Sequence, residues 1–343
     1  MKKKKKIMLS VVVAIVLLLA ATGGFFYYKL TSPFFDVKET VYVYVSEQKD
    51  YNDLLLQLQS IAKIKDIKMF GRLAETIGYP QKMKTGRYAV NSEISCKNLL
   101  ENLIRGTQTP CKVTFNNIRL KDELSENIGS QLMFGPAALQ QKLDDPVVCD
   151  QYGFGEQTIL CLFIPNTYEM YWNISIDRFL ERMKKEYDRF WTPERLEKAG
   201  KIPLSPVQVS ILASIVEEET IVPDEYPVVA GLYINRLRKG MLLQADPTVK
   251  YAVGNFSLKR ILYTHLEVDS PYNTYKYEGL PPGPIRVPSI GGIDAVLNYK
   301  RHQYLYMCAK EDFSGRHSFA SVMAEHLRNA QRYQAALNRN NIR

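Results

Sequence analysis

The chain has 343 residues, of which 46% are hydrophobic and 24% are charged, and these proportions are ordinary for a folded protein and argue against a disordered one. The net charge is +9, but Lys2 to Lys6 together with Lys29 supply six of these charges and leave +3 for the rest of the chain. This small remainder removes the main support for a nucleic-acid partner, and we expect none.

The chain begins with a five-lysine tail and then runs for 22 uncharged residues, from Ile7 to Tyr28. A helix of this length reaches roughly 33 Å, which is enough to cross the core of a bilayer. The aromatic residues 25–28 close the run like an interfacial belt, and the lysines obey the positive-inside rule. We therefore expect a cytoplasmic tail (1–6), a transmembrane helix (7–28) and an extracytoplasmic remainder, in a single-pass, N-in protein of the inner (cytoplasmic) membrane.

A cleavable signal peptide is the alternative, because Ala21-Thr22-Gly23 offers small residues at a spacing typical of cleavage sites. The apolar run continues past these residues instead of giving way to a polar mature start, and this favours the anchor. No cysteine lies near the run, so a lipoprotein is disfavoured.

After the apolar run, the pattern predicts a strand at 41–45, a helix through Leu54 and Leu58, a strand at 85–90, and a helix that starts after Ser95 and stops at Gly106. This alternation predicts a small α+β module over 38–115. From residue 116 the helical stretches become longer, as at 176–191 and 207–220, so we expect a second α+β domain over 116–343. The break at residues 106–110 is the predicted boundary.

The five cysteines are scattered, and none forms a C-x-x-C pair or stands beside a histidine at the spacing of metal ligands. We therefore expect no metal site and no other cofactor. A disulfide between Cys149 and Cys161 stays open as an alternative to buried free thiols, which we expect for most of the five.

The stretch with the most chemistry is the predicted helix at 207–220, which ends in Glu217-Glu218-Glu219. On a helical wheel Glu219 falls inside the apolar arc, whereas Glu217 lies beside Ala213 and Ser210. Small neighbours leave space for a substrate, and a carboxyl in such a cleft has the raised pKa that a general acid needs. A solvated acidic helix end gives the same pattern, so the three glutamates by themselves do not distinguish a catalytic site from an ordinary helix terminus.

Motifs downstream of this helix favour a catalytic site. The pattern of the helix, A-S-I-V-E-E-E, is followed by N-R-L at 235–237, L-Q-A-D-P-T at 243–248, Y-N-T-Y at 272–275 and G-L-P-P-G-P-I at 279–285. In order and spacing they resemble the YceG-like family of endolytic murein transglycosylases, and the resemblance covers essentially the whole chain. It implies an N-terminal membrane span, a small LysM-like module and an α+β catalytic domain.

Carried over to this sequence, the catalytic glutamate of the family, taken as the first of its E-x-E, falls on Glu217. The resemblance also implies a set of substrate-binding candidates: Gln244, Asp246, Thr248, Tyr272, Asn273, Tyr275, Glu219, Asn235 and His317. Two departures are visible, because the family's P-D-T-Y reads P-N-T-Y at 165–168 and the region resembling G-x-H-x-F stands at 315–319 with a variable flank. Asp246 precedes a proline and has an alternative role as the N-cap of a helix through Val253.

The resemblance implies a membrane-anchored lytic transglycosylase that cuts the MurNAc-GlcNAc β-1,4 bond of nascent peptidoglycan strands and forms 1,6-anhydro-MurNAc ends during cell-wall assembly. Its expected partners are the glycan strands and cell-wall synthases of the elongation machinery. One alternative is a muramidase-type hydrolase that uses Glu217 with Asp246 or Glu219. The other alternative is a non-catalytic glycan-binding scaffold.

Overall fold

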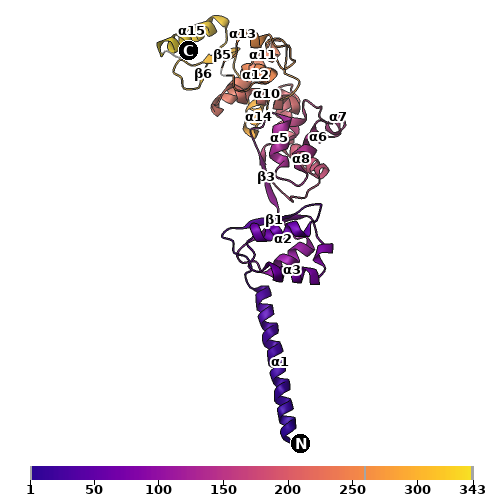
Figure 1. The fold of residues 1–343 in the computed structure, drawn as a ribbon. Helices are drawn as coiled ribbons and strands as arrows, with labels where there is room; N and C mark the ends of the chain where they lie inside the picture. Colours follow the sequence, from indigo (N-terminus) through magenta and orange to yellow (C-terminus); the bar gives the residue numbers. More distant parts are fainter. Residues whose placement is uncertain (1, 259, 341–343) are drawn as a thin grey trace. The chain divides into compact units, whose positions relative to one another are not determined.

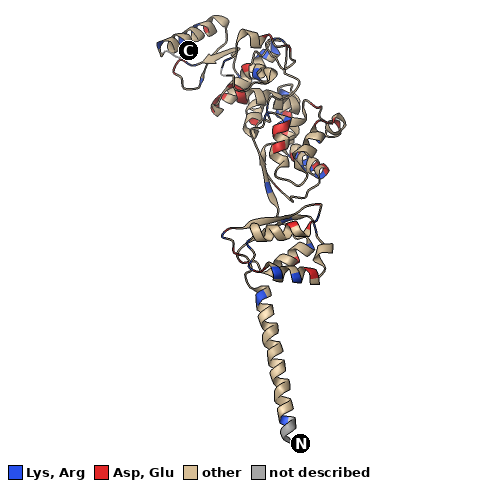
Figure 2. Ribbon diagram, viewed as in Figure 1, with Lys and Arg blue, Asp and Glu red and all other residues tan. Residues whose placement is uncertain are grey.

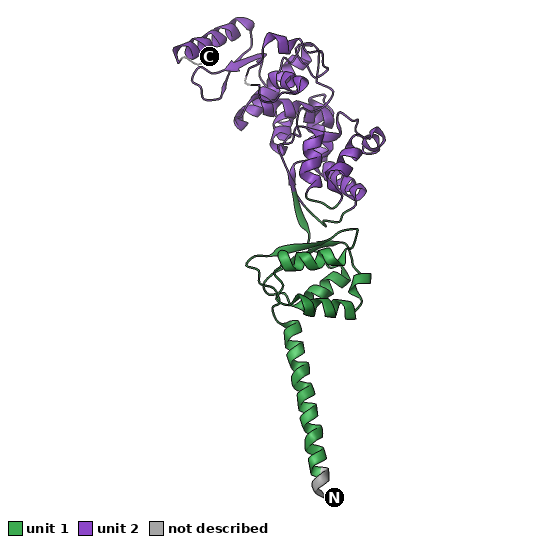
Figure 3. Cartoon of the chain, viewed as in Figure 1, with its two compact units in different colours: residues 1–113, 131–133, 169–174 green, residues 114–130, 134–168, 175–343 purple. Residues whose placement is uncertain are grey.

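The structure is a computed structural model that describes residues 2–258 and 260–340. The chain forms two compact units (Figure 3). Unit 1 contains Met1–Val113 and two later segments, Gln131–Met133 and Glu169–Ile174, and unit 2 contains the remaining residues. We expected a single boundary, at the break in residues 106–110, between domains at 38–115 and 116–343. In the structure the first segment of unit 1 ends at Val113, and the two short later segments fold with it.

Helix α1 (Lys2–Thr31) contains the whole stretch predicted to span a membrane. Within the described residues, Lys6–Thr31 is the one unbent helix that is long and apolar enough to cross a bilayer, and its apolar window has no buried residue. In Figure 2 the ribbon of this helix is blue, for lysine or arginine, near its two ends and tan between them.

The rest of unit 1 is built on strands β1 (Val41–Val45) and β2 (Gly86–Val90), which pair antiparallel with Val41 opposite Val90. Both strands were predicted. Four short helical segments surround them: α2 (Tyr51–Ser60), α3 (Ile67–Thr76), η1 (Tyr79–Gln81) and α4 (Cys96–Arg105).

The predicted caps of α4 are confirmed, because the Ser95 hydroxyl accepts the Asn98 N–H and Gly106 ends the helix at a positive φ of 73°. Helix α3 was not predicted. It buries only Phe70 and Ala74, so its apolar stripe is short and is interrupted by Gly71.

Unit 2 is mainly helical (Figure 1). Its first half holds α5 (Lys121–Gly129), α6 (Gly135–Leu143), α7 (Pro146–Gln151), η2 (Ile159–Leu162), α8 (Ile176–Phe190), α9 (Pro193–Lys201) and α10 (Pro206–Glu219). Its second half holds η3 (Pro223–Glu225), α11 (Tyr226–Arg238), α12 (Asp246–Val253), α13 (Tyr263–Leu266), α14 (Ile290–Leu297) and α15 (Met323–Arg339).

Two small sheets complete the fold. Strands β3 (Cys111–Phe115) and β4 (Asn166–Met170) form one sheet, and the boundary between the two units falls within each strand. Strands β5 (Tyr306–Ala309) and β6 (His317–Ala320) form another, antiparallel, with Ala309 opposite His317. The chain is therefore a mixed helix and sheet protein, as expected.

Helix α10 is the centre of the unit 2 core. Ser205 and Gln208 form a reciprocal capping box at its start, and every residue from Val209 to Val216 is buried. The helix packs against α11 and α14. Because the buried run stops at Val216, the three glutamates emerge together at the C-terminal end of a fixed helix, where their side chains can meet different surroundings.

The five cysteines are all free in the structure. Four are buried, Cys96, Cys111, Cys149 and Cys161, whereas Cys308 is partly exposed. The disulfide between Cys149 and Cys161 that the sequence left open is therefore not formed.

Candidate functional site

A cavity of about 240 Å³ lies at the C-terminal end of α10. Its walls come from α10, α11, the start of α12 with the loop before it, strands β5 and β6, and the tyrosine that ends the Y-N-T-Y motif. The lining residues are Glu219, Leu232, Tyr233, Arg236, Leu243, Gln244, Asp246, Tyr275, Met307, Cys308, Ala309 and His317. Five of the ten candidate residues named from the sequence meet here: Glu219, Gln244, Asp246, Tyr275 and His317.

The Glu219 carboxyl lies in this cavity and accepts a hydrogen bond of 2.5 Å from the Tyr233 hydroxyl. Burial raises the pKa of Glu219 to about 7, the hydrogen bond from Tyr233 opposes this shift, and the negative charge of Asp246 adds to it. A carboxyl with this pKa is protonated in a large fraction of molecules near neutral pH. It can therefore donate a proton to a bound molecule.

Asp246 is joined to Tyr275, whose hydroxyl donates to the Asp246 carboxylate at 2.6 Å. The alternative role of Asp246 as an N-cap is wrong. Ala245 occupies the N-cap position of α12 without a side-chain cap, and Asp246 is the first residue of the helix. Because its carboxylate is not turned back onto the helix amides, it remains available to the cavity.

Gln244 and Arg236 form another part of the cavity wall. Arg236 is almost fully buried and donates hydrogen bonds to the backbone carbonyls of Leu305 and Leu243, at 2.6 and 2.8 Å. The Gln244 side-chain oxygen accepts from Arg236 at 3.4 Å, and its backbone has a positive φ of 49°. Arg236 thus fixes the backbone that carries Gln244.

His317 enters the cavity wall from β6. Its backbone N–H and its ring Nδ1 both contact the Glu225 carboxylate, each at 2.9 Å. Glu225 also accepts a hydrogen bond from the Thr220 hydroxyl at 3.0 Å, and Thr220 directly follows Glu219 in the chain. The side chains of His317 and Glu225 are 15% and 7% exposed, so both are held in a largely buried position.

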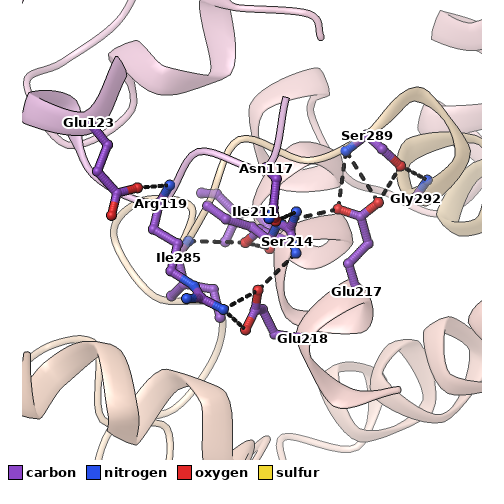
Figure 4. Close-up of polar contacts among 11 residues, drawn as sticks. Asn117, Arg119, Glu123, Ile211, Ser214, Glu217, Glu218, Ile285, Ser289 and Gly292 are labelled. Atoms are coloured by element: carbon purple, nitrogen blue, oxygen red, sulfur yellow. Dashed lines mark hydrogen bonds and ion pairs between the residues drawn. The ribbon is translucent and has the colours of Figure 1, made fainter. Parts of the chain in front are cut away.

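Glu217 is not among the residues that line this cavity, and its carboxylate points toward Ser289 (Figure 4). Its carboxylate accepts the Ser289 N–H at 3.0 and 3.2 Å as well as the Ser289 hydroxyl, and its side chain is only 5% exposed. A Cβ added at Gly292 would lie 2.6 Å from the Glu217 Cδ. The open cleft expected beside Glu217 is therefore wrong, because α14 fills the space that the small neighbours leave.

Glu218 is held by two arginines, Arg119 and Arg286, and Figure 4 shows Glu218 beside Arg119. Arg119 reaches both carboxylate oxygens from one nitrogen, at 3.0 and 3.1 Å, and Arg286 donates at 2.8 Å. Arg286 also donates to the Asn117 side chain at 2.5 Å. These contacts connect the segment before α5 to the C-terminal end of α10, so the role of Glu218 is structural.

Four other candidate residues are also engaged outside the cavity. Thr248 is fully buried and bonds to Thr274 at 2.8 Å, and Asn273 donates from its side chain to the carbonyls of Leu266 and Val268. These bonds hold the loop that carries Tyr275.

The remaining two candidates are Asn235, which contacts the loop after α14, and Tyr272, which packs against the core. The Asn235 side chain donates to the carbonyls of His302 and Tyr304, at 2.8 and 3.1 Å. The Tyr272 ring packs on Tyr251 with ring centroids 4.6 Å apart. Neither residue lines the cavity.

Tyr233 and Arg236 are cavity residues that the sequence analysis did not name as site candidates. They stand three residues apart on α11, so they share one face of the helix, and Arg236 belongs to the N-R-L motif. This spacing was the available signal. Residues 307–309 carry no such signal, because β5 reaches the cavity only through tertiary packing.

Comparison with known proteins identifies the family. The model of the YceG-like family matches residues 43–332, which is most of the chain. The chain belongs to the YceG-like family. An endolytic murein transglycosylase of Bacillus subtilis is 28% identical over 320 residues, which cover 88% of this chain and 87% of that protein.

A second relative, an endolytic murein transglycosylase of Streptococcus pneumoniae, is 25% identical over 332 residues, which cover 88% of this chain and 60% of that longer protein. Among solved structures, the crystal structure of a YceG-like protein from Listeria monocytogenes matches with a TM-score of 0.55 and 26% identity. The match covers 85% of this chain and 99% of that one. The chain therefore has a YceG-like fold along most of its length.

Proposed function

We propose that this YceG-like protein is a membrane-anchored endolytic lytic transglycosylase. It cuts the β-1,4 bond between MurNAc and GlcNAc in nascent glycan strands and leaves 1,6-anhydro-MurNAc ends. The name carried by its relatives in Bacillus and Streptococcus supports the reaction class. The observation that carries the proposal is the Glu219 carboxyl, which lines a cavity with polar walls and has a pKa raised to about 7.

In this proposal the general acid is Glu219 and not Glu217, so the sequence-based assignment moves by two residues. The Glu217 carboxylate is hydrogen-bonded to Ser289 and packs against Gly292, whereas Glu219 lines the cavity. A general acid must come within hydrogen-bond reach of the oxygen that it protonates. Glu217 could meet a glycosidic oxygen only after α14 had moved.

The reaction would begin when Glu219 donates its proton to the glycosidic oxygen that leaves C1 of MurNAc. The C6 hydroxyl of the same sugar then attacks C1 and closes the anhydro ring. The hydroxyl loses its proton in this step, and the Glu219 carboxylate is one base that can accept the proton. Because the nucleophile is already tethered to the reacting carbon, its effective molarity is high and no activated water is needed. Asp246, Tyr275 and Gln244 supply polar groups for the hydroxyl and acetamido substituents of the sugars.

The test compares three glutamine variants of the full chain in detergent, acting on purified uncrosslinked glycan strands, with the products weighed by mass spectrometry. Glu219→Gln should abolish turnover, which corresponds to roughly 3 to 6 kcal/mol of lost transition-state stabilisation. Glu218→Gln is the matched control from the same helix end and should retain activity if the protein folds. Loss of activity in Glu217→Gln alone, with normal folding, would restore the assignment made from the sequence.

The same products separate the two alternatives. A muramidase gives ends that are heavier by one water than anhydro ends. A glycan-binding scaffold gives no products, although the strands still bind. Anhydro ends made by the wild-type chain and lost in Glu219→Gln would support the transglycosylase.

We further propose that α1 is an uncleaved anchor in the inner (cytoplasmic) membrane with residues 1–6 in the cytoplasm and the catalytic domain (116–343) outside. The five-lysine tail and the uncharged helix support this topology. The module at 38–115, a two-stranded sheet with helices around it, is proposed to be LysM-like and to hold glycan. Its attachment beside the membrane suits work on nascent strands next to the cell-wall synthases of elongation.

A further inference from the structure

A second pair of ionisable side chains, which the proposed reaction leaves unused, lies at the wall of the cavity, and one of the two lines it. Glu225 and His317 come from different elements, η3 and β6, and contact each other through the Glu225 Oε2 and the His317 Nδ1 at 2.9 Å. Glu225 also accepts the His317 backbone N–H and the Thr220 hydroxyl, so three hydrogen bonds fix its orientation. A buried carboxylate with this many partners is held rigidly.

This pairing determines which ring nitrogen of His317 is available. A carboxylate accepts hydrogen bonds, so Nδ1 carries the proton and the lone pair of a neutral ring lies on Nε2. Within the described residues, Nε2 has no hydrogen-bond partner. His317 lines the cavity whereas Glu225 does not, so Nε2 is the nitrogen that a bound molecule can reach.

His302 is an example of a histidine whose imidazole ring has a purely structural role. Both ring nitrogens of His302 are engaged, since Nε2 contacts the Val228 carbonyl at 2.9 Å and Nδ1 accepts the Tyr304 N–H at 3.0 Å. His302 lies outside the cavity lining. His317 differs from it in both respects, with one nitrogen held and the other free.

The proposed reaction offers a task for such a group. A proton must leave the C6 hydroxyl of MurNAc as its oxygen closes on C1. The anhydro bridge and the departing β-linked oxygen lie on the same face of the sugar ring, so the acid and the base must stand on the same side of the substrate. Glu219 and His317 line the same cavity, so a single bound sugar can contact both.

We propose that His317 is the general base for ring closure and that Glu225 is its positioning residue; this inference rests on the proposed function. Glu219 protonates the leaving oxygen while the bond from C1 to that oxygen breaks. The C6 oxygen forms its bond to C1, and its proton passes to His317 Nε2. One proton has then moved from Glu219 to the leaving sugar and one from the C6 hydroxyl to His317, and exchange with solvent restores both residues.

The first test measures kcat and KM of the full chain in detergent on uncrosslinked glycan strands for His317→Ala. We expect kcat to fall by roughly 10² to 10⁴, with little change in KM, since general acid and base catalysis contributes factors of this size. Added imidazole should restore part of the rate in His317→Ala and none in Glu219→Gln. His326→Ala, which removes an imidazole outside the cavity lining, is the matched control and should keep wild-type kcat.

The second test uses Glu225→Gln, which keeps the shape of the side chain. The amide can donate to Nδ1, which moves the ring proton onto Nε2 and removes the lone pair from the cavity. We expect kcat to fall with KM unchanged and the melting temperature near that of wild type. This variant decides the proposal even if His317→Ala does not fold.

The outcomes separate this inference from the proposed function. If the wild-type chain makes no anhydro ends, the proposed function itself fails. If it makes them and His317→Ala keeps its kcat, or raises only KM, His317 binds substrate or supports structure and the inference is overturned. A loss in His317→Ala that imidazole does not rescue, together with full kcat in Glu225→Gln, overturns it as well.

Discussion

The pKa of Glu219 gives the site a pH dependence whose direction follows from its neighbours. Because burial and Asp246 raise the pKa of Glu219 to about 7, the acid form is lost as pH rises through that value. We expect kcat/KM to decline above about pH 7. In Asp246→Asn the negative charge that raises the pKa of Glu219 is absent, so this pKa falls. The decline in kcat/KM should then begin at lower pH. A pH profile in Asp246→Asn that moves to higher pH would contradict the account.

The same shift links Glu219 to the stability of unit 2. The folded state holds the Glu219 proton up to about pH 7, whereas an unfolded glutamate releases it near its ordinary pKa of 4.5. Stability contributed by the protonated carboxyl is therefore present below pH 4.5 and is lost as pH rises through 7.

A glutamine at this position does not titrate, so wild type and Glu219→Gln should respond differently to pH. Between pH 4.5 and pH 8, wild type should lose on the order of 3 kcal/mol of unfolding free energy relative to Glu219→Gln. Urea denaturation of both proteins at the two pH values measures this difference. An equal pH response in the two proteins would show that Glu219 titrates normally.

Two glycines follow Ile290 in the first turn of α14, and only the second of them lies against α10. A Cβ at Gly292 would meet the Glu217 Cδ at 2.6 Å, whereas at Gly291 the nearest atom is the Ser289 Oγ at 3.6 Å. We expect Gly292→Ala to lower the unfolding free energy by about 1 to 3 kcal/mol, because Glu217 must leave its bonds to Ser289. Gly291→Ala should be neutral or stabilising, since alanine favours helix over glycine.

A double-mutant cycle checks the cause of this cost. In a Glu217→Ala background the obstructing carboxyl is absent, so Gly292→Ala should cost less there than in wild type. Equal costs in both backgrounds would mean that the α10 and α14 backbones, and not the Glu217 side chain, limit the space. Thermal or urea unfolding of the four proteins gives the answer.

On the scale of the whole molecule, the proposed topology predicts the location of both ends of the chain. A reporter enzyme fused after residue 343 should be active outside the cytoplasm, because the lysines hold the N-terminus inside. The mature protein in the membrane should still begin at the lysine tail. N-terminal sequencing measures this directly, and a mature start near Gly24 would show a cleaved signal peptide instead.

Much of the local structure could be predicted from the sequence. Strand β1, the Ser95 and Gly106 ends of α4, and the helix that ends in three glutamates all follow from short-range patterns of apolar residues and caps. These features depend on residues within one or two turns of each other. The family pattern was also readable, since its motifs are local stretches with a fixed order.

The candidate site depended on contacts that no local pattern contains. The wheel correctly separated the faces of Glu217 and Glu219, but the sequence does not reveal that α14 covers the first or that Tyr233, Asp246 and β5 surround the second. Small neighbours beside a carboxyl create space, and a distant element either fills this space or leaves it open. Local sequence thus determined where the glutamates emerge from α10, and the packing of segments far apart in the chain decided which of them faces a cavity.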